Sequence, residues 1–502
     1  MTILNSIASW FMKKRMHQIE LFMKYPHEVQ NEWLLNLIDT AKNTEFGKKH
    51  DFKNITNSEQ FKSIPLQDYE SLKPLIERTR RGEQNLLWNT EIKWFAKSSG
   101  TTDKSKYIPV SKEFLNGCHY NGGRDMITFQ CINNPETKLF TGKNLALGGS
   151  YKTDSFGDYN SFHGDVSAII IQNLPMWAEY FRSPDVNIAL MDNWNEKLEK
   201  IAQSMAYENV TSLAGVPSWM LVLIKRILEI RNAKTLKDVW PNLEVYFHGG
   251  VSFTPYQNLF ENLFENSKVN YIQLYSASEG FFGIQDEKET HEMLLMLDYG
   301  IYYEFILVND LKESNPKTFN LSEVQLNKNY ALLITTNSGL WRYQIGDTIQ
   351  FTNLSPYRFI ITGRTKQYLN VFGEELMIHN TEQAIKTACE KTKTHIIDYT
   401  VAPIFMNNQS GSHEWLIEFE NEPEHLDYFI KILDDNLKAK NSDYEAKRFN
   451  NYVLKLPTIT SLPKGTFYKW LKINNKLGGQ FKVPRLNNSR KIADEILLSV
   501  KN

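Results

Sequence analysis

The sequence predicts an α/β protein of two domains: a large N-terminal domain with mixed sheets flanked by helices, and a smaller α+β C-terminal domain. Three observations predict this class. The chain has 502 residues, and this length is more than a single hydrophobic core usually organises. Hydrophobic residues make up 41% of the chain. Short apolar runs alternate with helical patterns between about residues 90 and 362. From about residue 380 the order becomes helix, strand, strand, helix.

The first 90 residues have a polar, helical pattern. Residues 3–12 are fairly apolar and precede Lys13-Lys14-Arg15, which reverses the charge order of a secretory signal. Four apolar side chains have the spacing of one helix face: Trp10, Met16, Ile19 and Met23. We expect a docked helix, with binding to a membrane surface as the alternative. The three basic residues are interpreted as solvated helix charges.

The central part of the chain alternates predicted strands and helices. Residues 92–96 form a strand that leads into a polar loop, and Ser111 can cap a helix that runs to about residue 130, which gives a strand, loop, helix order. Pro217 stands at the first turn of a buried helix over residues 218–230. Further strands are predicted at residues 243–247, 269–275, 330–336, 340–351 and 358–362. This alternation implies a mostly parallel sheet, whose ligands collect beyond the strand carboxyl ends.

The C-terminal part has a different order of elements. Two helices and two strands are predicted at residues 380–391, 396–405, 415–420 and 423–437. We place the boundary at Gly363 to Gln367, where a turn and two positive charges interrupt the pattern. The predicted domains are therefore residues 1–362 and 363–502.

Composition limits the partners and the compartment. The formal net charge of −1 gives no global attraction to nucleic acid or to an acidic membrane. Cys118, Cys131 and Cys389 have no Cys-x-x-Cys spacing, which favours a reducing compartment over a disulfide framework or a zinc site. No segment approaches about 18 uninterrupted apolar residues. We expect a cytoplasmic protein without nucleic-acid or membrane partners, and we assign no oligomeric state.

Two common hydrolase patterns are missing from the sequence. The eleven histidines include no His-x-x-x-His pair, which a zinc hydrolase helix would need. Gly-x-Ser-x-Gly, the nucleophile turn of α/β-hydrolases, is also absent. Neither hydrolase class is supported.

The loop from Lys97 to Lys106 is the most informative segment. It concentrates hydroxyls, one glycine and lysines directly after an apolar segment. Glycine lets backbone N–H groups approach an anion, hydroxyls add short donors, and lysines add positive charge, a combination suited to a polyphosphate. The spacing excludes a Walker-type loop. Considered alone, this loop is better explained as a solvated turn. A role in phosphate binding therefore depends on the other motifs of the chain.

Three more polar clusters end predicted strands, at residues 248–250, 275–279 and 342–347. The order Ser-Ser-Gly-Thr-Thr, Tyr-x-x-Ser-Glu-Gly and Arg-Tyr-x-x-Gly-Asp resembles the adenylate-forming enzymes and, more narrowly, the GH3 acyl acid amido synthetases. The resemblance extends from Thr44-Glu45-Phe46-Gly47 to Gln480-Phe481-Lys482-Val483-Pro484-Arg485. Each motif is moderately specific, and the three in this order are strong together.

The resemblance implies that the hydroxyl loop binds the phosphates of ATP. The residues that would cradle them are Ser98, Ser99, Thr101 and Thr102, with Lys106 as a mobile counter-charge. Asp103 departs from the family pattern, because another glycine usually stands there. An acidic residue beside a triphosphate is unfavourable unless it faces solvent or magnesium.

The resemblance also assigns the nucleoside and Mg²⁺. The ring of Tyr275 would stack on adenine, with the backbone of Gly249 and Gly250 as the opposite wall. Asp347 would accept the two ribose hydroxyls, and Glu279 would hold Mg²⁺ with phosphate oxygens and waters. Ser278 and Arg364 complete the implied nucleotide-binding residues. From the residues alone, Tyr275 fits a half-buried strand tyrosine and Glu279 an ordinary loop acid.

The resemblance implies functional roles for four basic residues, for which ordinary surface or structural roles are the alternatives. Lys366 lies where adenylating enzymes pivot, so residues 363–367 would be the hinge of a mobile C-terminal domain. Lys482 would stabilise charge during adenylation, although a surface lysine fits nearly as well. Arg124 would pair the substrate carboxylate, or be a solvated helix charge. Arg342 fits a phosphate contact and a structural ion pair equally.

The function implied is a two-step ligase. ATP and a small carboxylic acid would form an acyl adenylate, and an amine, that of an amino acid, would then attack the acyl carbon and release AMP. The adenylation half rests on motifs in this sequence, and the amine half on the resemblance. The alternatives are a coenzyme A ligase that shares the first step and a non-catalytic nucleotide- or ligand-binding homologue.

Overall fold

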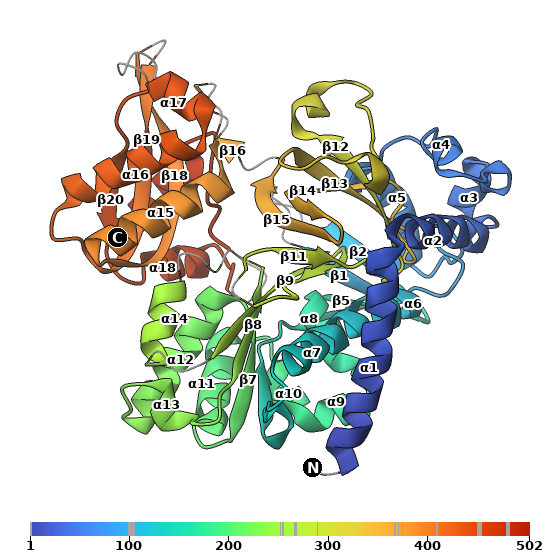
Figure 1. Ribbon diagram of the computed structural model, residues 1–502, viewed down its shortest axis with the longest axis horizontal. Helices are drawn as coiled ribbons and strands as arrows, with labels where there is room; N and C mark the ends of the chain where they lie inside the picture. Colours follow the sequence, from blue (N-terminus) through green and yellow to red (C-terminus); the bar gives the residue numbers. More distant parts are fainter. Residues whose placement is uncertain are drawn as a thin grey trace. The chain divides into compact units, whose positions relative to one another are not determined.

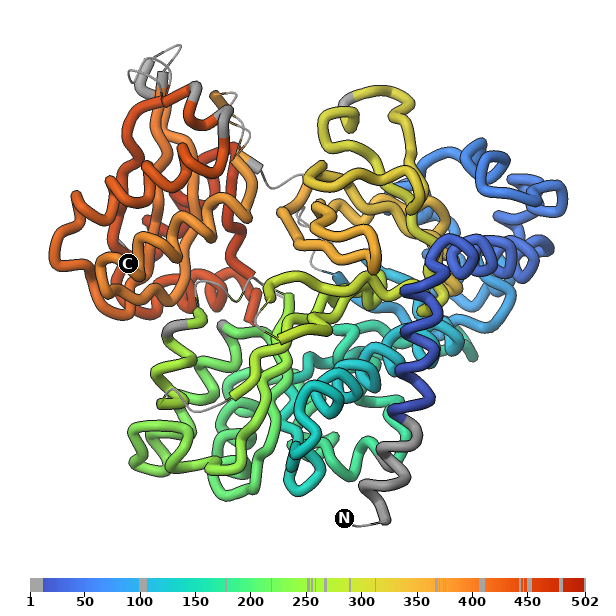
Figure 2. Tube along the Cα trace, in the orientation of Figure 1, coloured from blue at the N-terminus to red at the C-terminus, as the bar shows by residue number. Residues whose placement is uncertain are grey.

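The structure is a computed structural model that describes residues 3–98, 106–250, 253, 256–265, 269–288, 290–365, 368–369, 371–372, 374, 376–407, 410–448, 454–477 and 482–501. The chain divides into two compact units (Figure 1). Unit 1 comprises Met1–Gly215, Trp240–Gly250 and Lys268–Ile360, and unit 2 comprises Val216–Val239, Val251–Ser267 and Ile361–Asn502. Each unit therefore combines segments distant in the sequence, and Figure 2 colours the chain by residue number. The boundary at residue 362 stays a prediction.

A large mixed sheet forms the centre of unit 1 (Figure 1). In order across the sheet, its strands are β12 (Ile301–Leu307), β13 (Asn329–Thr336), β14 (Tyr343–Leu354), β15 (Tyr357–Arg364), β11 (Met293–Leu295), β10 (Gly280–Ile284), β9 (Asn270–Ala277), β8 (Val245–Gly249), β7 (Val210–Gly215), β3 (Lys143–Ala146) and β6 (Arg182–Ser183).

The direction of the strands changes at β9. The strands β6, β3, β7, β8 and β9 pair in parallel. Beyond β9, the pairs β9–β10, β10–β11, β11–β15, β12–β13 and β13–β14 are antiparallel. The mixed α/β class is confirmed, but the expectation of a mostly parallel sheet is right for one part only. Short turns such as Asn337-Ser338-Gly339 join neighbouring strands, which forces those strands to be antiparallel.

A second sheet of unit 1 has the order β2 (Lys106–Val110), β1 (Trp94–Ser98), β5 (Tyr159–Gly164) and β4 (Tyr151–Phe156). β1 and β2 are antiparallel, with Ser98 opposite Lys106. The predicted strand, loop, helix order is therefore wrong, because a strand stands between the loop and the helix. Pro109, which pairs with Phe95, weakens the strand signal of a five-residue segment.

The helices of unit 1 lie mostly in its N-terminal part. They are α1 (Ile3–Lys24), α2 (Pro26–Ala41), α3 (Glu45–Lys49), α4 (Ser58–Phe61), α5 (Tyr69–Arg80), α6 (Lys112–Phe114), the π-helix η2 (Leu115–Tyr120), α7 (Asn121–Asn133), α8 (Val166–Gln172), α9 (Met176–Phe181), α10 (Val186–Ala189) and α11 (Trp194–Met205). Short 3₁₀ turns are η1 (Phe52–Asn54), η3 (Leu139–Thr141), η4 (Val308–Lys312) and η5 (Leu321–Glu323).

The N-terminal helix is docked, as the apolar spacing predicts. Ile19 and Phe22 of α1 are buried. Lys13 and Lys14 are exposed, but Arg15 is buried and donates to Asp125 of α7 at 2.7–3.0 Å. The interpretation of Arg15 as a solvated charge is therefore wrong, since a triplet of basic residues does not reveal which member faces the core. None of the described helices is long and apolar enough to span a membrane.

The segment after β2 begins as expected. The Ser111 side chain accepts a hydrogen bond from the N–H of Phe114 at 3.0 Å, so Ser111 caps the first turn. The helix then passes through the π-helical turn η2 before α7 continues to Asn133. Such turns are frequent at functional sites.

Unit 2 contains a three-stranded sheet in the order β18 (His395–Asn407), β19 (Ser410–Asn421) and β20 (Thr458–Leu462). The short strands β16 (Tyr368–Leu369) and β17 (Leu376–Met377) form a separate pair. Its helices are α12 (Pro217–Arg231), α13 (Leu236–Val239), α14 (Gln257–Leu263), α15 (Ile378–Thr392), α16 (Leu426–Lys440), α17 (Ser442–Arg448), α18 (Thr466–Ile473) and α19 (Lys491–Lys501). Ile385, Trp415 and Phe429 belong to one buried core, which fixes α15 and α16 against the sheet.

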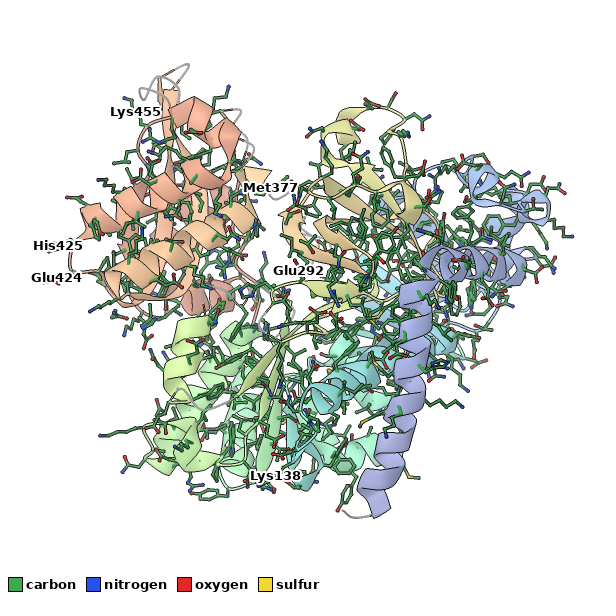
Figure 3. All side chains as sticks on the ribbon, in the orientation of Figure 1. Lys138, Glu292, Met377, Glu424, His425 and Lys455 are labelled. Carbon is green, nitrogen blue, oxygen red and sulfur yellow. The ribbon has the colours of Figure 1, made fainter. Side chains whose placement is uncertain are left out.

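The predicted C-terminal elements correspond to α15, β18, β19 and α16. The helix α15 begins after Met377, labelled in Figure 3, whose N–H donates to Asn380 Oδ1 at 3.0 Å. The helix α12 begins at Pro217, as predicted. The grouping of α12 with the C-terminal residues had no sequence signal.

Candidate functional site

Two parallel strands end side by side in unit 1. Gly249 of β8 pairs with Leu274 of β9, so Gly250 follows at the level of Tyr275. A Cβ atom on Gly249 would lie 2.6 Å from the carbonyl oxygen of Leu274, and Gly250 has φ of 80°. Both positions require glycine, the first for close backbone approach and the second for its conformation. The pair forms a backbone surface without side chains beside Tyr275.

The neighbouring His248 is buried. Burial, and then the charge of His291, lowers the pKa of His248 to about 3, so its imidazole is neutral at physiological pH. The residue therefore adds no positive charge to this edge of the sheet.

Tyr275 and Asp347 are in direct contact. The Tyr275 hydroxyl donates to Asp347 Oδ2 at 2.7 Å, and both side chains are buried. The Tyr275 ring packs against Phe282 and Phe359, with centroid distances of 4.8 and 6.0 Å. The structure thus brings together the residues predicted to hold adenine and ribose, although they are 72 positions apart in sequence.

A bulge in β14 presents Asp347. Ala331 of β13 pairs with Thr348, whereas Leu333 pairs with Gln344, so Ile345, Gly346 and Asp347 together face the single residue Leu332. Gly346 has φ of 92°, a conformation that glycine adopts without strain. Bulges re-aim side chains next to active sites, and this one accounts for the Gly-Asp order of the motif.

Glu279 is buried in the turn between β9 and β10, and Ser278 beside it is half-buried. The Glu279 carboxylate acts electrostatically on Tyr343 of β14. Burial, and then the charge of Glu279, raises the pKa of Tyr343, so its phenol stays protonated. The β9 end and β14 therefore meet at Tyr275 and Asp347, and the charge of Glu279 also acts on Tyr343.

The hydroxyl loop begins and ends at paired residues. Ser98 closes β1 opposite Lys106, which opens β2. Lys106 Nζ lies 5.9 Å from the centroid of the Tyr69 ring, and the Tyr69 hydroxyl accepts a hydrogen bond from Tyr107 N–H at 2.9 Å. Tyr69 also acts electrostatically on Tyr343. The strands that carry the loop are thus linked through α5 to the same part of β14.

The remaining predicted site residues are placed as follows. Ser99, Thr101 and Thr102 of the loop, Asp103, and Lys366 of the predicted hinge lie outside the described residues. Lys482 and Arg364 are exposed residues of unit 2. Arg124 is 43% exposed on α7, and its Nε donates to Asp125 Oδ1 at 3.2 Å.

Arg342 is structural. Its guanidinium donates to the Glu304 carboxylate at 2.8–3.2 Å, to Thr318 Oγ1 at 2.9 Å and to the carbonyls of Lys62 and Ile64. Both Arg342 and Glu304 are buried. Of the two interpretations of Arg342, the ion pair is the one that the structure supports.

Glu279 is the buried carboxylate of this site that could contribute to holding a magnesium nucleotide. Among the described residues, no group of three or more His, Cys, Asp or Glu side chains could hold a metal ion by itself. Mg²⁺ is commonly held by one or two carboxylates together with phosphate oxygens and waters. A single buried carboxylate at Glu279 near an unpartnered buried hydroxyl at Tyr343 is consistent with that arrangement.

Tyr343 was not singled out by the sequence. It lies within the Arg-Tyr-x-x-Gly-Asp motif, and the resemblance implies no separate role for it. Its side chain is fully buried, yet its hydroxyl has no hydrogen-bond partner among the described residues. A tyrosine within a strand does not indicate from the sequence whether its hydroxyl has a hydrogen-bond partner. The missing partner is seen only in the folded structure.

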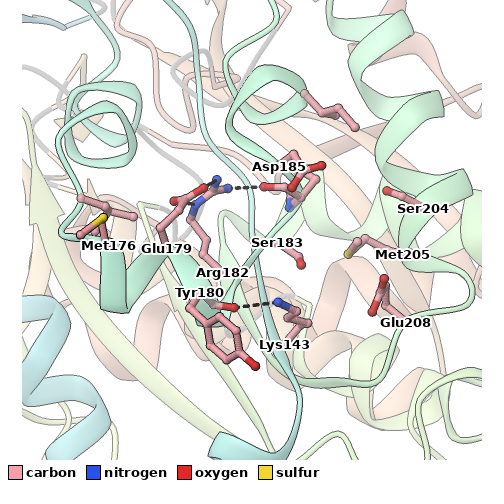
Figure 4. A pocket seen from close by; sticks show the side chains of 13 residues that line it. Lys143, Met176, Glu179, Tyr180, Arg182, Ser183, Asp185, Ser204, Met205 and Glu208 are labelled. Carbon is pink, nitrogen blue, oxygen red and sulfur yellow. Dashed lines mark hydrogen bonds and ion pairs between the residues drawn. The ribbon is translucent and has the colours of Figure 1, made fainter.

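A separate cavity of about 550 Å³ lies elsewhere in unit 1. It is lined by residues of β3, α9, β6, α10 and α11 and of the segments between them (Figure 4). Lys143 donates to the carbonyl oxygen of Tyr180 at 2.7 Å there, and Arg182 pairs with Glu179. None of its lining residues is among those predicted for the site, so the cavity gives no support to the nucleotide assignment.

Comparison with known proteins places this fold. Three family models match: the GH3 family N-terminal domain over residues 15–269, central domain over 294–364 and C-terminal domain over 379–491. The relative indole-3-acetic acid-amido synthetase GH3.3 of Arabidopsis thaliana is 22% identical over 545 residues, covering 94% of this chain and 91% of its own.

Two solved structures share the fold. AtGH3.15 acyl acid amido synthetase in complex with 2,4-DB has a TM-score of 0.80 at 17% identity, covering 97% of this chain and 96% of its own. 2-Hydroxyisobutyryl-CoA ligase in the postadenylation state with 2-HIB-AMP has 0.61 at 12% identity, covering 94% and 91%. The fold is therefore that of the adenylate-forming ligases. Within that class, the chain belongs to the GH3 family.

Proposed function

We propose that the protein is an ATP-dependent acyl acid amido synthetase. It adenylates a small carboxylic acid and transfers the acyl group to the amine of an amino acid, with release of pyrophosphate and AMP. Family membership supports the reaction class, since similar relatives are named as amido synthetases. The observation that carries the adenylation half is the buried contact between Tyr275 and Asp347 beside Gly249.

The nucleoside end of the proposed site follows from that contact. We assign the adenine base to the Tyr275 ring and the backbone of Gly249 and Gly250, positions that carry no side chain. The carboxylate of Asp347 accepts hydrogen bonds from vicinal hydroxyls, which a charged acceptor does with greater strength than an amide. These features select a ribonucleoside over a phosphorylated sugar or a simple polyphosphate.

The phosphate end requires donors and positive charge. Ser98, at the start of the hydroxyl loop, and Lys106, at its end, face each other across the β1–β2 pair. We assign the loop hydroxyls Ser99, Thr101 and Thr102 to the phosphates on the sequence motif. Mg²⁺, held by Glu279 with phosphate oxygens, would offset the negative charge of the triphosphate.

The two chemical steps balance without a further reactant. In the first, a carboxylate oxygen of the acid attacks the α-phosphorus of ATP and pyrophosphate leaves. In the second, the neutral amine attacks the acyl carbon, AMP leaves with the bonding electrons, and the amine proton passes to solvent. Adenylation supplies a good leaving group, so a difficult amide synthesis becomes two accessible steps. Lys482 and Arg124 are assigned to charge stabilisation and to the acid carboxylate by family resemblance.

The predicted hinge extends the proposal. Lys366 and Arg364 lie in the segment at which adenylating enzymes pivot, so residues 363–502 would move between the two steps. We also propose a cytoplasmic location, because the spacing of Cys118, Cys131 and Cys389 in the sequence favours a reducing compartment.

The test is a product assay with the whole chain. Purified protein, ATP and Mg²⁺ are incubated with a panel of carboxylic acids, and each mixture receives either amino acids or coenzyme A. The proposal expects acid-dependent pyrophosphate exchange and an amide product. A thioester without amide would identify the coenzyme A ligase instead. Nucleotide binding without exchange, in an assay validated by an active ligase, would identify a binding protein.

A further inference from the structure

The buried hydroxyl of Tyr343 stands out among the polar atoms of unit 1. The side chain is fully buried, and its hydroxyl lies out of contact with water without a hydrogen-bond partner among the described residues. An unpaired hydroxyl of this kind costs stability, because it loses its bonds to water and gains none. Such groups are rare in native structures and call for a specific explanation.

The position of Tyr343 suggests that explanation. It opens β14, the strand that also carries Asp347, and its neighbour Gln344 donates from its N–H to Gln67 at 2.9 Å. Glu279, Tyr69 and Asp68 all act electrostatically on its hydroxyl. Other buried atoms also lack partners among the described residues, including both ring nitrogens of His119. Tyr343 differs from His119 because the charge of the proposed magnesium ligand, Glu279, acts on it.

The chemistry of the phenol defines what it can bind. It stays protonated, because burial and the nearby carboxylate oppose its ionisation. The phenol is therefore a neutral hydrogen-bond donor and can donate to an oxygen acceptor. Tyr69 connects this place to Lys106, whose ammonium lies 5.9 Å from the Tyr69 ring centroid at the end of the hydroxyl loop. The acceptor expected between the loop and Glu279 is a phosphate oxygen.

We propose that Tyr343 is a positioning residue whose hydroxyl donates to a phosphate oxygen of bound ATP. The inference rests on the proposed function and adds to it a donor from β14. Because the hydroxyl is buried in the nucleotide-free chain, the proposal requires the residues that cover it to move when the phosphate binds. The stability lost to an unpaired hydroxyl is then recovered as affinity for the triphosphate.

The test compares Tyr343→Phe with Tyr303→Phe in the full chain. Tyr303 is an equally buried tyrosine of the same sheet, but its hydroxyl donates to the carbonyl of Met296 at 3.0 Å. Removing the paired hydroxyl of Tyr303 should lower Tm and leave ATP affinity unchanged. Removing the unpaired hydroxyl of Tyr343 should leave Tm unchanged or raise it, and weaken ATP binding at least about tenfold in calorimetry, the loss of one hydrogen bond to a charged acceptor.

Adenosine is the control ligand, because it has the nucleoside of ATP but no phosphate for Tyr343 to contact. Tyr343→Phe should bind adenosine as the wild type does. A Tm that falls as far as in Tyr303→Phe would show that the hydroxyl has a protein partner and would overturn the inference. So would ATP affinity within twofold of wild type, or equal weakening of adenosine. Wild-type protein that fails to bind ATP would instead refute the proposed function, and the inference with it.

Discussion

The Tyr275 hydroxyl and the Asp347 carboxylate form a buried hydrogen bond of 2.7 Å that joins the end of β9 to the bulge of β14. The bond fixes the edge of the Tyr275 ring and one oxygen of Asp347 in a single arrangement. Adenine and ribose recognition would thus be coupled, because a shift of either side chain moves the other. The nucleoside end of the proposed site is thus assembled before nucleotide binds, so it loses less conformational entropy on binding.

Asp347→Asn should weaken ATP binding by about tenfold, because an amide oxygen accepts ribose hydroxyls more weakly than a carboxylate does. The fold should persist, since the amide oxygen can still accept from Tyr275. Calorimetry with ATP and 2′-deoxy-ATP measures the effect: the wild type should prefer ATP, and the variant should lose that preference. Unchanged discrimination would remove Asp347 from the ribose site.

Glu279→Gln should abolish Mg²⁺-dependent pyrophosphate exchange, because an amide is a poor magnesium ligand. The Tm should change little, because the glutamine side chain has nearly the same size as that of glutamate. Glu287→Gln is the matched control, an exposed acid a few residues further along the chain. Exchange is measured against Mg²⁺ concentration for both. Equal rates in the two variants would count against Glu279 as the metal ligand.

Arg342→Ala should lower the free energy of unfolding by about 3–5 kcal/mol, because it leaves the buried Glu304 carboxylate without its partner. Arg342 also has φ of 43°, which the surrounding bonds hold in place. Arg78→Ala, which removes an exposed pair with Glu45 and Glu83, should have a much smaller effect. Denaturant titration compares them. Weakened ATP binding with unchanged stability would restore the phosphate-contact interpretation.

Stability in acid should depend on Glu374 of unit 2, which accepts from His413 Nε2 at 2.9 Å and from the N–H of Phe372 at 2.6 Å. Burial acts to raise the pKa of Glu374, but these hydrogen bonds outweigh burial and lower it. A lowered pKa stabilises the fold above the ordinary glutamate value near 4.5, and this contribution disappears as pH falls through the folded value.

The Glu374→Gln variant should therefore be less stable than wild type at neutral pH and approach it in acid. Unfolding in denaturant is followed at several pH values between neutral and about pH 3, with Glu390→Gln, a substitution of an exposed residue on α15, as control. A constant difference between wild type and Glu374→Gln at all pH values would contradict the pKa direction.

The sequence predicted the elements whose signals are local. Pro217 marks the start of α12, Ser111 caps the turn before η2, and the apolar run at residues 330–336 falls within β13. The sequence did not predict β2, because a strand of five residues that contains Pro109 carries little periodicity. The antiparallel part of the sheet was missed because strand direction depends on pairing between distant segments rather than on local pattern.

The candidate site also combines features that the sequence motifs predict with features that depend on residues distant in the sequence. Motif order placed Tyr275, Glu279 and Asp347 in one site, and the structure brings Tyr275 into contact with Asp347. The burial of Arg15 and the partner of Arg342 depend on Asp125 and Glu304, which lie far away in the sequence and follow no motif. The unpaired hydroxyl of Tyr343 is a property of the folded environment, so no pattern of residues could predict it.

A crystal structure of the protein with AMP tests the central claim most directly. The account predicts adenine against the Tyr275 ring and the Gly249-Gly250 backbone, with both ribose hydroxyls on Asp347 and the phosphate toward Ser98. AMP bound elsewhere, such as in the cavity beside Lys143, or a ribose that does not reach Asp347, would contradict it.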